Sequence, residues 1–317
     1  MFILEHEYEG EKSMRKISKL ALATAALLLA GTAAVMAQQK NISVKGSDTM
    51  VILGQRWAEV FMGKNAGLTI QVTGGGSGTG IAALINGTTD ICEASRPMKD
   101  AEKADAKAKR GKDVLELPVA VDGLAVYVNE ANPLTELTLA QIKSIYTGAV
   151  KNWKDVGGKD QKIILYSREN NSGTYVYFKE HVLENGDYYP TAQTLPGTAA
   201  VINAVAQDTR GIGYGGIAYG KGIKHLNIKK DANTPAVAPT MENVLAAKYP
   251  ISRYLYWYLA GLPSGDTKKL VDWVYSKEGQ EVVEKVGYYP LNEADRVTFS
   301  ARASGGAAKV VAAKAKN

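Results

Sequence analysis

The stretch Gln71-Val72-Thr73-Gly74-Gly75-Gly76-Ser77-Gly78-Thr79-Gly80 lies where a predicted strand passes into a predicted helix. Apolar residues alternate with polar ones over 68–72 and recur at helical spacing over 81–85. The glycines remove Cβ atoms from the bend, so backbone N–H groups can turn toward one point beside the positive end of the helix. Such a loop suits an anion, with Ser77 or Thr79 as a hydroxyl donor. A tight turn without a ligand is an equal alternative from this loop alone.

The spacing of the loop excludes three better-known uses of glycine. Counted from Gly74, Thr79 stands where a dinucleotide-binding G-x-G-x-x-G would place its last glycine, and no GK[ST] of a nucleotide P-loop occurs in the chain. Thr79 also occupies the last glycine position of a G-x-S-x-G nucleophile elbow around Ser77. The loop therefore predicts neither a nucleotide site nor a serine hydrolase.

The N-terminal part of the chain has the pattern of an export signal. Residues 14–19 include three basic residues, Arg15, Lys16 and Lys19, and residues 20–35 form an apolar run too short for a comfortable membrane span. Val35-Met36-Ala37 fits a small-x-small cleavage site. We predict that 1–37 is a presequence containing a signal peptide, preceded by a mis-assigned start, and that the exported chain begins near Gln38. An uncleaved anchor is the alternative.

The net charge of +6 is concentrated at one end of the chain. Basic and acidic residues balance over 1–37, whereas the low-complexity segment 301–317 contains four basic residues, so about +2 remains for 38–300. A basic tail of this kind, which we expect to be disordered, is weak support for a polyanionic partner, and no nucleic-acid partner is predicted. With Cys92 as the only cysteine, no intrachain disulfide and no lipid-anchor cysteine is expected. We predict a soluble periplasmic protein.

Two further segments repeat the order of strand, Gly/Ser/Thr turn and helix. The turn 45–49 follows a short predicted strand and precedes a helical face over 50–61, with N-capping as the alternative role of its hydroxyls. The turn 167–174 follows a buried strand over 162–166 and precedes a helix over 175–183. An arginine lies near each of two turns, Arg168 within its own turn and Arg96 after the strand 88–94.

The other expected elements continue the alternation of strands and helices. They are a polar helix over 100–110, a long strand over 115–129 interrupted at Asp122-Gly123, a helix begun by the capping box 138–141, a helix over 199–206, strands over 211–217 and 249–259, and helices over 266–275 and 277–285. This alternation predicts α/β layers with mixed sheets.

Groups that could carry covalent chemistry are sparse. His181 and His225 are spaced with no second metal ligand, and Cys92 lies in an apolar strand where a core role is expected. No catalytic residue, metal or cofactor is predicted. The three turns together are rich in donors and poor in acceptors, which suits an oxyanion held by fixed dipoles.

Short motifs occur in a fixed order along residues 41–291. They occupy 45–50, 73–80, 94–98, 122–126, 152–153, 167–174, 211–214 and 249–253. In this order they resemble the phosphate-binding proteins of Pst-type ABC importers, a family of periplasmic solute-binding proteins. The set is far more specific than any one loop.

The resemblance implies a two-lobed periplasmic-binding-protein fold of type II, with a mixed sheet flanked by helices in each lobe. By position, lobe I would comprise 38–122 plus 250–300 and lobe II 123–249, joined by crossovers near Asp122-Gly123 and Tyr249-Pro250. A monomer of this kind would bind inorganic phosphate with high affinity in the periplasm and deliver it to an inner-membrane ABC permease. The alternatives are a binding protein for sulfate, molybdate or tungstate and, less favoured, a secreted phosphatase.

The resemblance also implies a ligand set. Thr49, the Met50 backbone, Ser77 and the turn 172–174 would donate to phosphate oxygens, and Arg168 would be the charged ligand. The full predicted set is Ser47, Thr49, Met50, Ser77, Ser95, Arg96, Arg168, Ser172, Gly173 and Thr174.

One member of this set departs from the family pattern. Arg96 follows the Ala-Ser pair where some family members have an aspartate that accepts the proton of hydrogen phosphate. Such an acceptor discriminates against sulfate, so either Asp48 or Asp122 would replace it or the selectivity would be weaker. We hypothesise that Arg96 and Arg168 clamp the anion from opposite lobes.

Overall fold

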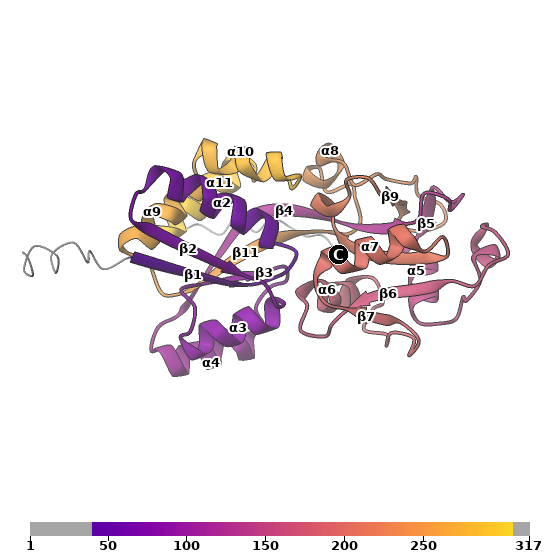
Figure 1. The fold of residues 1–317 in the computed structure, drawn as a ribbon, viewed down its shortest axis with the longest axis horizontal. Helices are drawn as coiled ribbons and strands as arrows, with labels where there is room; N and C mark the ends of the chain where they lie inside the picture. The colour runs from indigo at the N-terminus through magenta and orange to yellow at the C-terminus, as the bar shows by residue number, and fades with distance from the viewer. Residues whose placement is uncertain (1–39, 307–317) are drawn as a thin grey trace, which may run out of the picture. The chain divides into compact units, whose positions relative to one another are not determined.

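A computed structural model describes residues 40–306 (Figure 1). The strands are β1 Lys40–Gly46, β2 Leu68–Thr73, β3 Ile91–Ala94, β4 Val114–Val128, β5 Glu136–Thr138, β6 Ile164–Arg168, β7 Gln193–Leu195, β8 Gly211–Gly216, β9 Lys224–His225, β10 Asn227–Lys229 and β11 Ser252–Ala260. The helices are α2 Val51–Lys64, α3 Ser77–Asn86, α4 Asp100–Arg110, α5 Leu139–Tyr146, α6 Gly173–His181, α7 Gly197–Gln207, α8 Met241–Leu245, α9 Gly265–Val274, α10 Lys277–Val286 and α11 Glu293–Ala303, with short 3-10 turns η1 Trp153–Val156 and η2 Ile217–Tyr219.

One mixed sheet runs through the fold in the order β2-β1-β3-β11-β4-β8-β6-β7. β1 is parallel to β3, and β6 is parallel to both β7 and β8, whereas β11 is antiparallel to β3 and β4. Helices α3 and α4 cover one face of the β1–β3 part, and α2, α9, α10 and α11 cover the other (Figure 1). The predicted α/β class with a mixed sheet is confirmed.

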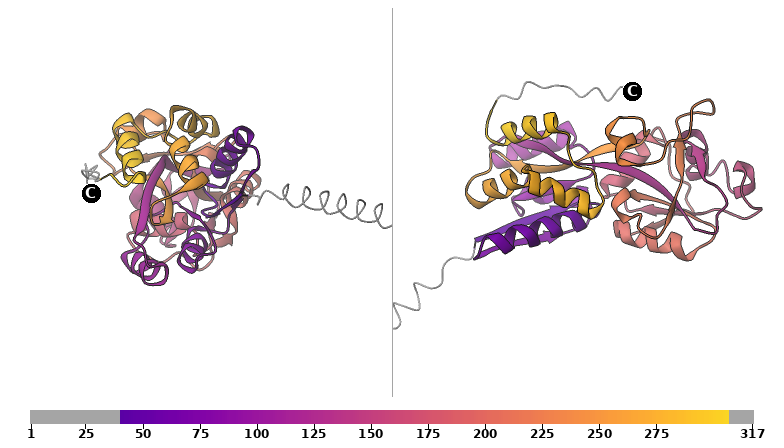
Figure 2. Two further views of the ribbon diagram at one scale, coloured as in Figure 1. Left: turned by 90° about the vertical axis from the view of Figure 1, so that its left-hand side faces the viewer. Right: turned by 90° about the horizontal axis from the view of Figure 1, so that it is seen from above.

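Strand β4 joins two parts of this sheet. Its residues 114–123 pair with β11, and residues 124–128 pair with β8. β4 and β11 run side by side as the longest strands of the fold (Figure 2). The strand continues unbroken through Asp122-Gly123, where the sequence predicted an interruption, because the glycine keeps an extended conformation and only the partner strand changes.

Two expectations about element ends are wrong. Helix α6 ends at His181, so Val182 and Leu183 fill the core from beyond the helix rather than from its face. Helix α11 was not predicted, and it extends to Ala303, inside the segment 301–317 that we expected to be disordered. Asn292 caps this helix by accepting from Asp295, and Phe299 and Ala303 are its buried residues.

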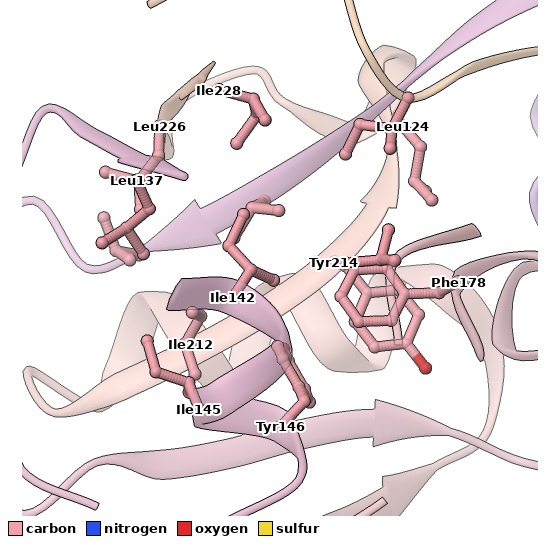
Figure 3. Close-up of a cluster of buried hydrophobic side chains, with 14 of the residues drawn as sticks. Leu124, Leu137, Ile142, Ile145, Tyr146, Phe178, Ile212, Tyr214, Leu226 and Ile228 are labelled. Carbon is pink, nitrogen blue, oxygen red and sulfur yellow. The ribbon is translucent and has the colours of Figure 1, made fainter. Parts of the chain in front are cut away.

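A large apolar cluster packs α5 and α6 against β4 and β8 (Figure 3). Phe178 of α6 stacks on Tyr214 of β8 with ring centroids 3.9 Å apart. The Tyr214 hydroxyl lies 2.9 Å from Oγ of Ser167, at the end of β6. Packing therefore fixes the start of α6 and the end of β6, the two places from which Thr174 and Arg168 extend.

The predicted signal peptide and the last residues of the predicted tail lie outside the described residues. No helix within 40–306 is both long enough and apolar enough to cross a bilayer. Cys92 is fully buried among the apolar residues of β3, as expected for a core cysteine.

Candidate functional site

Six buried hydroxyl groups from five segments meet in one network, which we call the hydroxyl cluster. Oγ of Ser95 lies 2.9 Å from Oγ of Ser47, 3.4 Å from Oγ of Ser77 and 3.4 Å from Oγ1 of Thr174. Oγ1 of Thr49 lies 2.8 Å from that of Thr174 and 3.5 Å from that of Thr198. All six side chains are buried: Ser47, Thr49, Ser77, Ser95, Thr174 and Thr198.

Local structure explains why these hydroxyls face one another. Helices α2 and α3 have no side-chain N-cap, so the capping role that the sequence allowed for the turn 45–49 is not taken up. Gly173 brings the start of α6 against the start of α3, since a Cβ at this position would collide with Oγ of Ser77 and lie 2.8 Å from Oγ of Ser95. The turns predicted to hold an anion therefore converge.

Arg168 brings positive charge to this cluster. Its Nη1 donates to Oγ1 of Thr198 at 2.8 Å, and its Nη2 forms a 2.6 Å ion pair with Asp48. The side chain is 1% exposed, and its Nε is buried without a hydrogen-bond partner among the described residues. Burial lowers the pKa of Arg168, and the Asp48 carboxylate opposes that shift. A buried donor of this kind has a hydrogen bond to give that the described part of the protein does not accept.

Arg253 is a second buried cation beside the cluster. Its Nε and Nη2 donate to Oδ2 of Asp122 at 3.1 and 2.9 Å, and its Nη1 donates to the Ser95 carbonyl at 2.8 Å. Nη2 also donates to Oγ1 of Thr174 at 3.0 Å. Because Thr174 accepts from Arg253, its own proton points elsewhere in the cluster.

The remaining members of the predicted turns have partners of their own. Ser172 is the N-cap of α6, with Oγ accepting from the Tyr175 amide, and this bond does not use the Ser172 hydroxyl proton. The Met50 amide donates to the Ser47 carbonyl at 2.9 Å, and the side chain of Met50 is fully buried.

The glycine loop differs from its predicted role as an anion cradle. The Gly75 amide donates to Oδ1 of Asp48 at 2.7 Å, and the Gly78 amide donates to the Asn171 carbonyl at 2.9 Å. Two donors that the sequence offered to an anion therefore bind other parts of the chain. The glycines allow close approach of chain segments, and the hydroxyl of Ser77 is what the loop adds to the cluster.

The clamp predicted for Arg96 is corrected by its contacts. Arg96 donates to both carboxylate oxygens of Glu102, at 2.7 and 2.8 Å, and to the Pro97 carbonyl at 2.9 Å. Burial acts to lower the pKa of Arg96, but the bonds to Glu102 raise it above its ordinary value. Glu102 lies in the first turn of α4, so Arg96 ties the end of β3 to that helix. None of these hydrogen bonds reaches a hydroxyl of the cluster.

Two residues of the site were missed by the sequence. Thr198 lies in the first turn of α7, two residues after Pro196, and the predicted helix began just beyond it. Arg253 ends the motif 249–253, for which the sequence predicted no ligand. The sequence did contain a signal for Arg253, which stands among aromatic and aliphatic residues of a strand. Burial of an unpaired arginine is very costly, so an arginine in such a strand indicates a buried partner.

No group of three or more His, Cys, Asp or Glu side chains within 40–306 is arranged to hold a metal ion. His181 stacks on Tyr177 at 4.0 Å between centroids, outside the hydroxyl cluster.

A family profile described as the PBP superfamily domain matches residues 31–278. The phosphate-binding protein PstS of Pseudomonas aeruginosa is 37% identical over 268 residues, which cover 79% of this chain and 83% of that protein. PstS of Bacillus subtilis is 32% identical over 255 residues, covering 80% of this chain and 81% of its relative. The chain belongs to the PstS family of the PBP superfamily.

Solved structures of phosphate transport proteins share the fold. A phosphate ABC transporter substrate-binding protein from Clostridium perfringens, solved with bound phosphate, is 30% identical with a TM-score of 0.72, covering 80% of this chain and all of that one. An ABC-type phosphate transport receptor from Vibrio cholerae is 28% identical with a TM-score of 0.64, covering 79% of this chain and 100% of its own. The predicted two-lobed binding-protein fold is therefore confirmed.

Proposed function

We propose that this PstS-family chain binds inorganic phosphate in the periplasm and delivers it to an ABC-type import permease. The hydroxyl cluster carries the proposal. Six hydroxyls are buried and bond mainly to one another, beside an arginine whose Nε has no partner among the described residues. A tetrahedral oxyanion could accept from these donors in place of the hydroxyl–hydroxyl bonds, and hydrogen bonds to an ion are about twice as strong as neutral ones.

The ligand set follows from the contacts. Ser47, Thr49, Ser77, Ser95 and Thr174 would donate hydroxyl protons, and Arg168 would supply the charge. Thr198 and Arg253 hold these groups in place, Thr198 by accepting from Arg168 and Arg253 by donating to Thr174. Ser172, Gly173 and the Met50 backbone line the same turns, while Arg96 is removed from the set.

Asp48 is the favoured acceptor for the proton of hydrogen phosphate. Each of its carboxylate oxygens has one partner, Gly75 N on Oδ1 and Arg168 Nη2 on Oδ2, so lone pairs remain on both. Oδ2 of Asp122 already accepts two bonds from Arg253. Asp48 is also bonded directly to the proposed phosphate ligand Arg168, which supports a position beside the anion.

A hinge at the crossovers would let phosphate enter. β4 changes its pairing partner between residues 123 and 124, close to the predicted boundary between lobe I (38–122 plus 250–300) and lobe II (123–249). The cluster takes Thr49 and Ser77 from the first group of residues and Thr174 and Thr198 from the second. Ligand contacts to both groups would favour the closed form, and a monomer in that form would dock on the permease.

Binding without catalysis is the expected chemistry. Among the described residues, the groups bonded to the cluster hydroxyls are other hydroxyls, arginine and backbone, so none of these bonds gives a serine or threonine a general base. This arrangement supports a binding protein over a phosphatase.

Calorimetric titration of the chain beginning at Gln38, stripped of endogenous ligand by unfolding and refolding, tests the proposal. We expect tight binding of phosphate that a hundred-fold excess of sulfate, molybdate or tungstate does not displace. Equal competition would assign the site to another oxyanion. Release of phenol from an aryl phosphate would reveal a phosphatase.

A further inference from the structure

Asn171 bridges two loops that are far apart in the sequence. Its side-chain Nδ2 donates to the Gly75 carbonyl at 3.0 Å and lies 3.4 Å from Oγ1 of Thr79. Its backbone carbonyl accepts from the Gly78 amide at 2.9 Å. Side chain and main chain of one residue therefore contact three residues of the loop 75–79, namely Gly75, Gly78 and Thr79.

The carbonyl contact replaces an N-cap that helix α3 lacks. The cap residue Gly76 gives no side-chain hydrogen bond, and Gly78 carries one of the N-terminal amides that no helical carbonyl can reach. Asn171 satisfies this amide from another segment of the chain. Separating the two loops would leave the Gly78 amide to water alone.

Glycine makes this approach possible. Gly76 has φ +89°, and a Cβ on it would lie 2.7 Å from the Asn171 carbonyl oxygen. A side chain at this position would both strain the backbone and push the loops apart. The glycine loop is thus shaped to receive Asn171.

Asn171 lies next to the hydroxyl cluster without belonging to it. On one side Ser77 of the cluster lies within the contacted loop, and on the other Thr174 lies three residues after Asn171. An open hollow of about 470 Å³, lined by Glu169, Asn170, Asn171, Tyr175 and Thr194, borders the contact. Water can therefore replace the contact when the loops part.

We infer that Asn171 is a latch between the loops 75–79 and 169–172, which lie in different proposed lobes, and that it slows the release of phosphate. The inference rests on the proposed function. The latch holds the closed form and touches no ligand, so its loss acts on dissociation, while association, which starts from the open form, is spared.

Two rates measured on one set of variants test the latch. Release of radiolabelled phosphate, chased with unlabelled phosphate, should be about five-fold faster in Asn171→Ala, the effect of losing one net hydrogen bond. Association, followed by stopped-flow tryptophan fluorescence, should change less than two-fold. Asn171→Asp keeps the size of the side chain but sets a carboxylate against the Gly75 carbonyl, and should release faster still. The matched control is Asn170→Ala, whose side chain is exposed.

Amide exchange gives a readout that needs no phosphate. In the ligand-free protein, exchange at the Gly78 amide should be several-fold faster in Asn171→Ala than in Asn170→Ala. If wild-type protein binds phosphate and both the release rate and this exchange match the control, the latch is wrong. If wild-type protein binds no phosphate, the proposed function is wrong and so is the effect of Asn171 on phosphate release. The exchange rate of the Gly78 amide then decides by itself whether Asn171 holds the two loops together.

Discussion

Asp122 of β4 and Arg253 of β11 are register partners, and their side chains form a buried ion pair with a 2.9 Å contact beside the hydroxyl cluster. Asp122 also accepts from the Ile217 amide, at the end of β8. The ion pair therefore lies where β4 stops pairing with β11 and begins to pair with β8. It couples the proposed hinge to Thr174, to which Arg253 donates.

Asp122→Asn should lower the free energy of unfolding by about 3 kcal/mol, because it leaves the Arg253 charge buried without its counter-ion. Urea denaturation at constant m-value measures this change. Phosphate binding should weaken as well, since Arg253 no longer holds the Thr174 hydroxyl in place.

The matched control for this variant is Asp160→Asn. Asp160 pairs with Lys154 at 3.1 Å, and both side chains are more than half exposed. Its loss should leave the midpoint unchanged within error. Equal midpoints for Asp122→Asn and Asp160→Asn would contradict the role given to the buried pair.

Arg96→Ala should leave the phosphate affinity unchanged and lower the free energy of unfolding by about 2 kcal/mol, the scale of hydrogen bonds to a charged group. The reason is that both Glu102 bonds belong to the junction of β3 and α4. Calorimetric titration and urea denaturation of the same preparation separate the two effects.

Glu102→Gln serves as the companion variant, because it weakens the same contact from the other side. It should reproduce the loss of stability, again without a change in affinity. A clear loss of phosphate affinity in Arg96→Ala alone would return Arg96 to the ligand set.

The sequence predicted the local units of this fold well, because their signals are local. The helix over 100–110 has the predicted bounds, and the capping box of Thr138 and Gln141 forms as expected. β4 was recognised by its apolar run, but its unbroken course depends on two different partner strands, which no local pattern reveals.

The sequence predicted the turns that contribute to the candidate site, but it did not predict which side chains bond to one another there. Ser47, Ser77 and Thr174 stand at helix starts that composition marks clearly, and they do meet. Arg96 pairs with Glu102, which lies only six residues away in a helix that the sequence predicted to be solvated. The Arg96 side chain therefore bonds to this carboxylate and not to the hydroxyl cluster. Thr198 and Arg253 act through contacts across 30 residues or more, which spacing cannot predict.

Asp48→Asn should reduce the preference for phosphate over sulfate by at least ten-fold, since Nδ2 in place of Oδ2 donates and the remaining acceptor, Oδ1, already accepts from the Gly75 amide. Competition calorimetry with the two anions measures the ratio. Phosphate affinity itself should also fall, whereas sulfate affinity should hold or rise, because a negative charge beside the anion is removed.

Asp122→Asn is the comparison for selectivity. It should weaken both anions without changing their ratio, because the Asp122 carboxylate is occupied by Arg253. If Asp122→Asn alone changes the ratio, Asp122 is the acceptor and Asp48 only positions Arg168.

Glu93 should make the protein less stable as pH rises. It is fully buried, Oε1 accepts from Nε1 of Trp257 at 3.1 Å, and Oε2 has no partner among the described residues. Burial raises its pKa from 4.5 to about 8, and the bond from Trp257 opposes that shift. Between these two pKa values the folded chain binds more protons than the unfolded chain. The contribution of protonated Glu93 to the free energy of unfolding is therefore full below pH 4.5 and is lost as the pH rises toward 8.

Within this window Glu93 should lower the free energy of unfolding by up to about 1.4 kcal/mol per pH unit. Glu93→Gln keeps the acceptor for Trp257 and does not ionise, so it should remove this slope and be the more stable protein at pH 8.5. Glu284→Gln, at an exposed position of α10, should keep the wild-type slope. Urea denaturation of the three proteins from pH 5 to pH 9 measures it. Parallel curves for wild type and Glu93→Gln would mean that Glu93 is already ionised at pH 5 and that its buried oxygen is bonded to water.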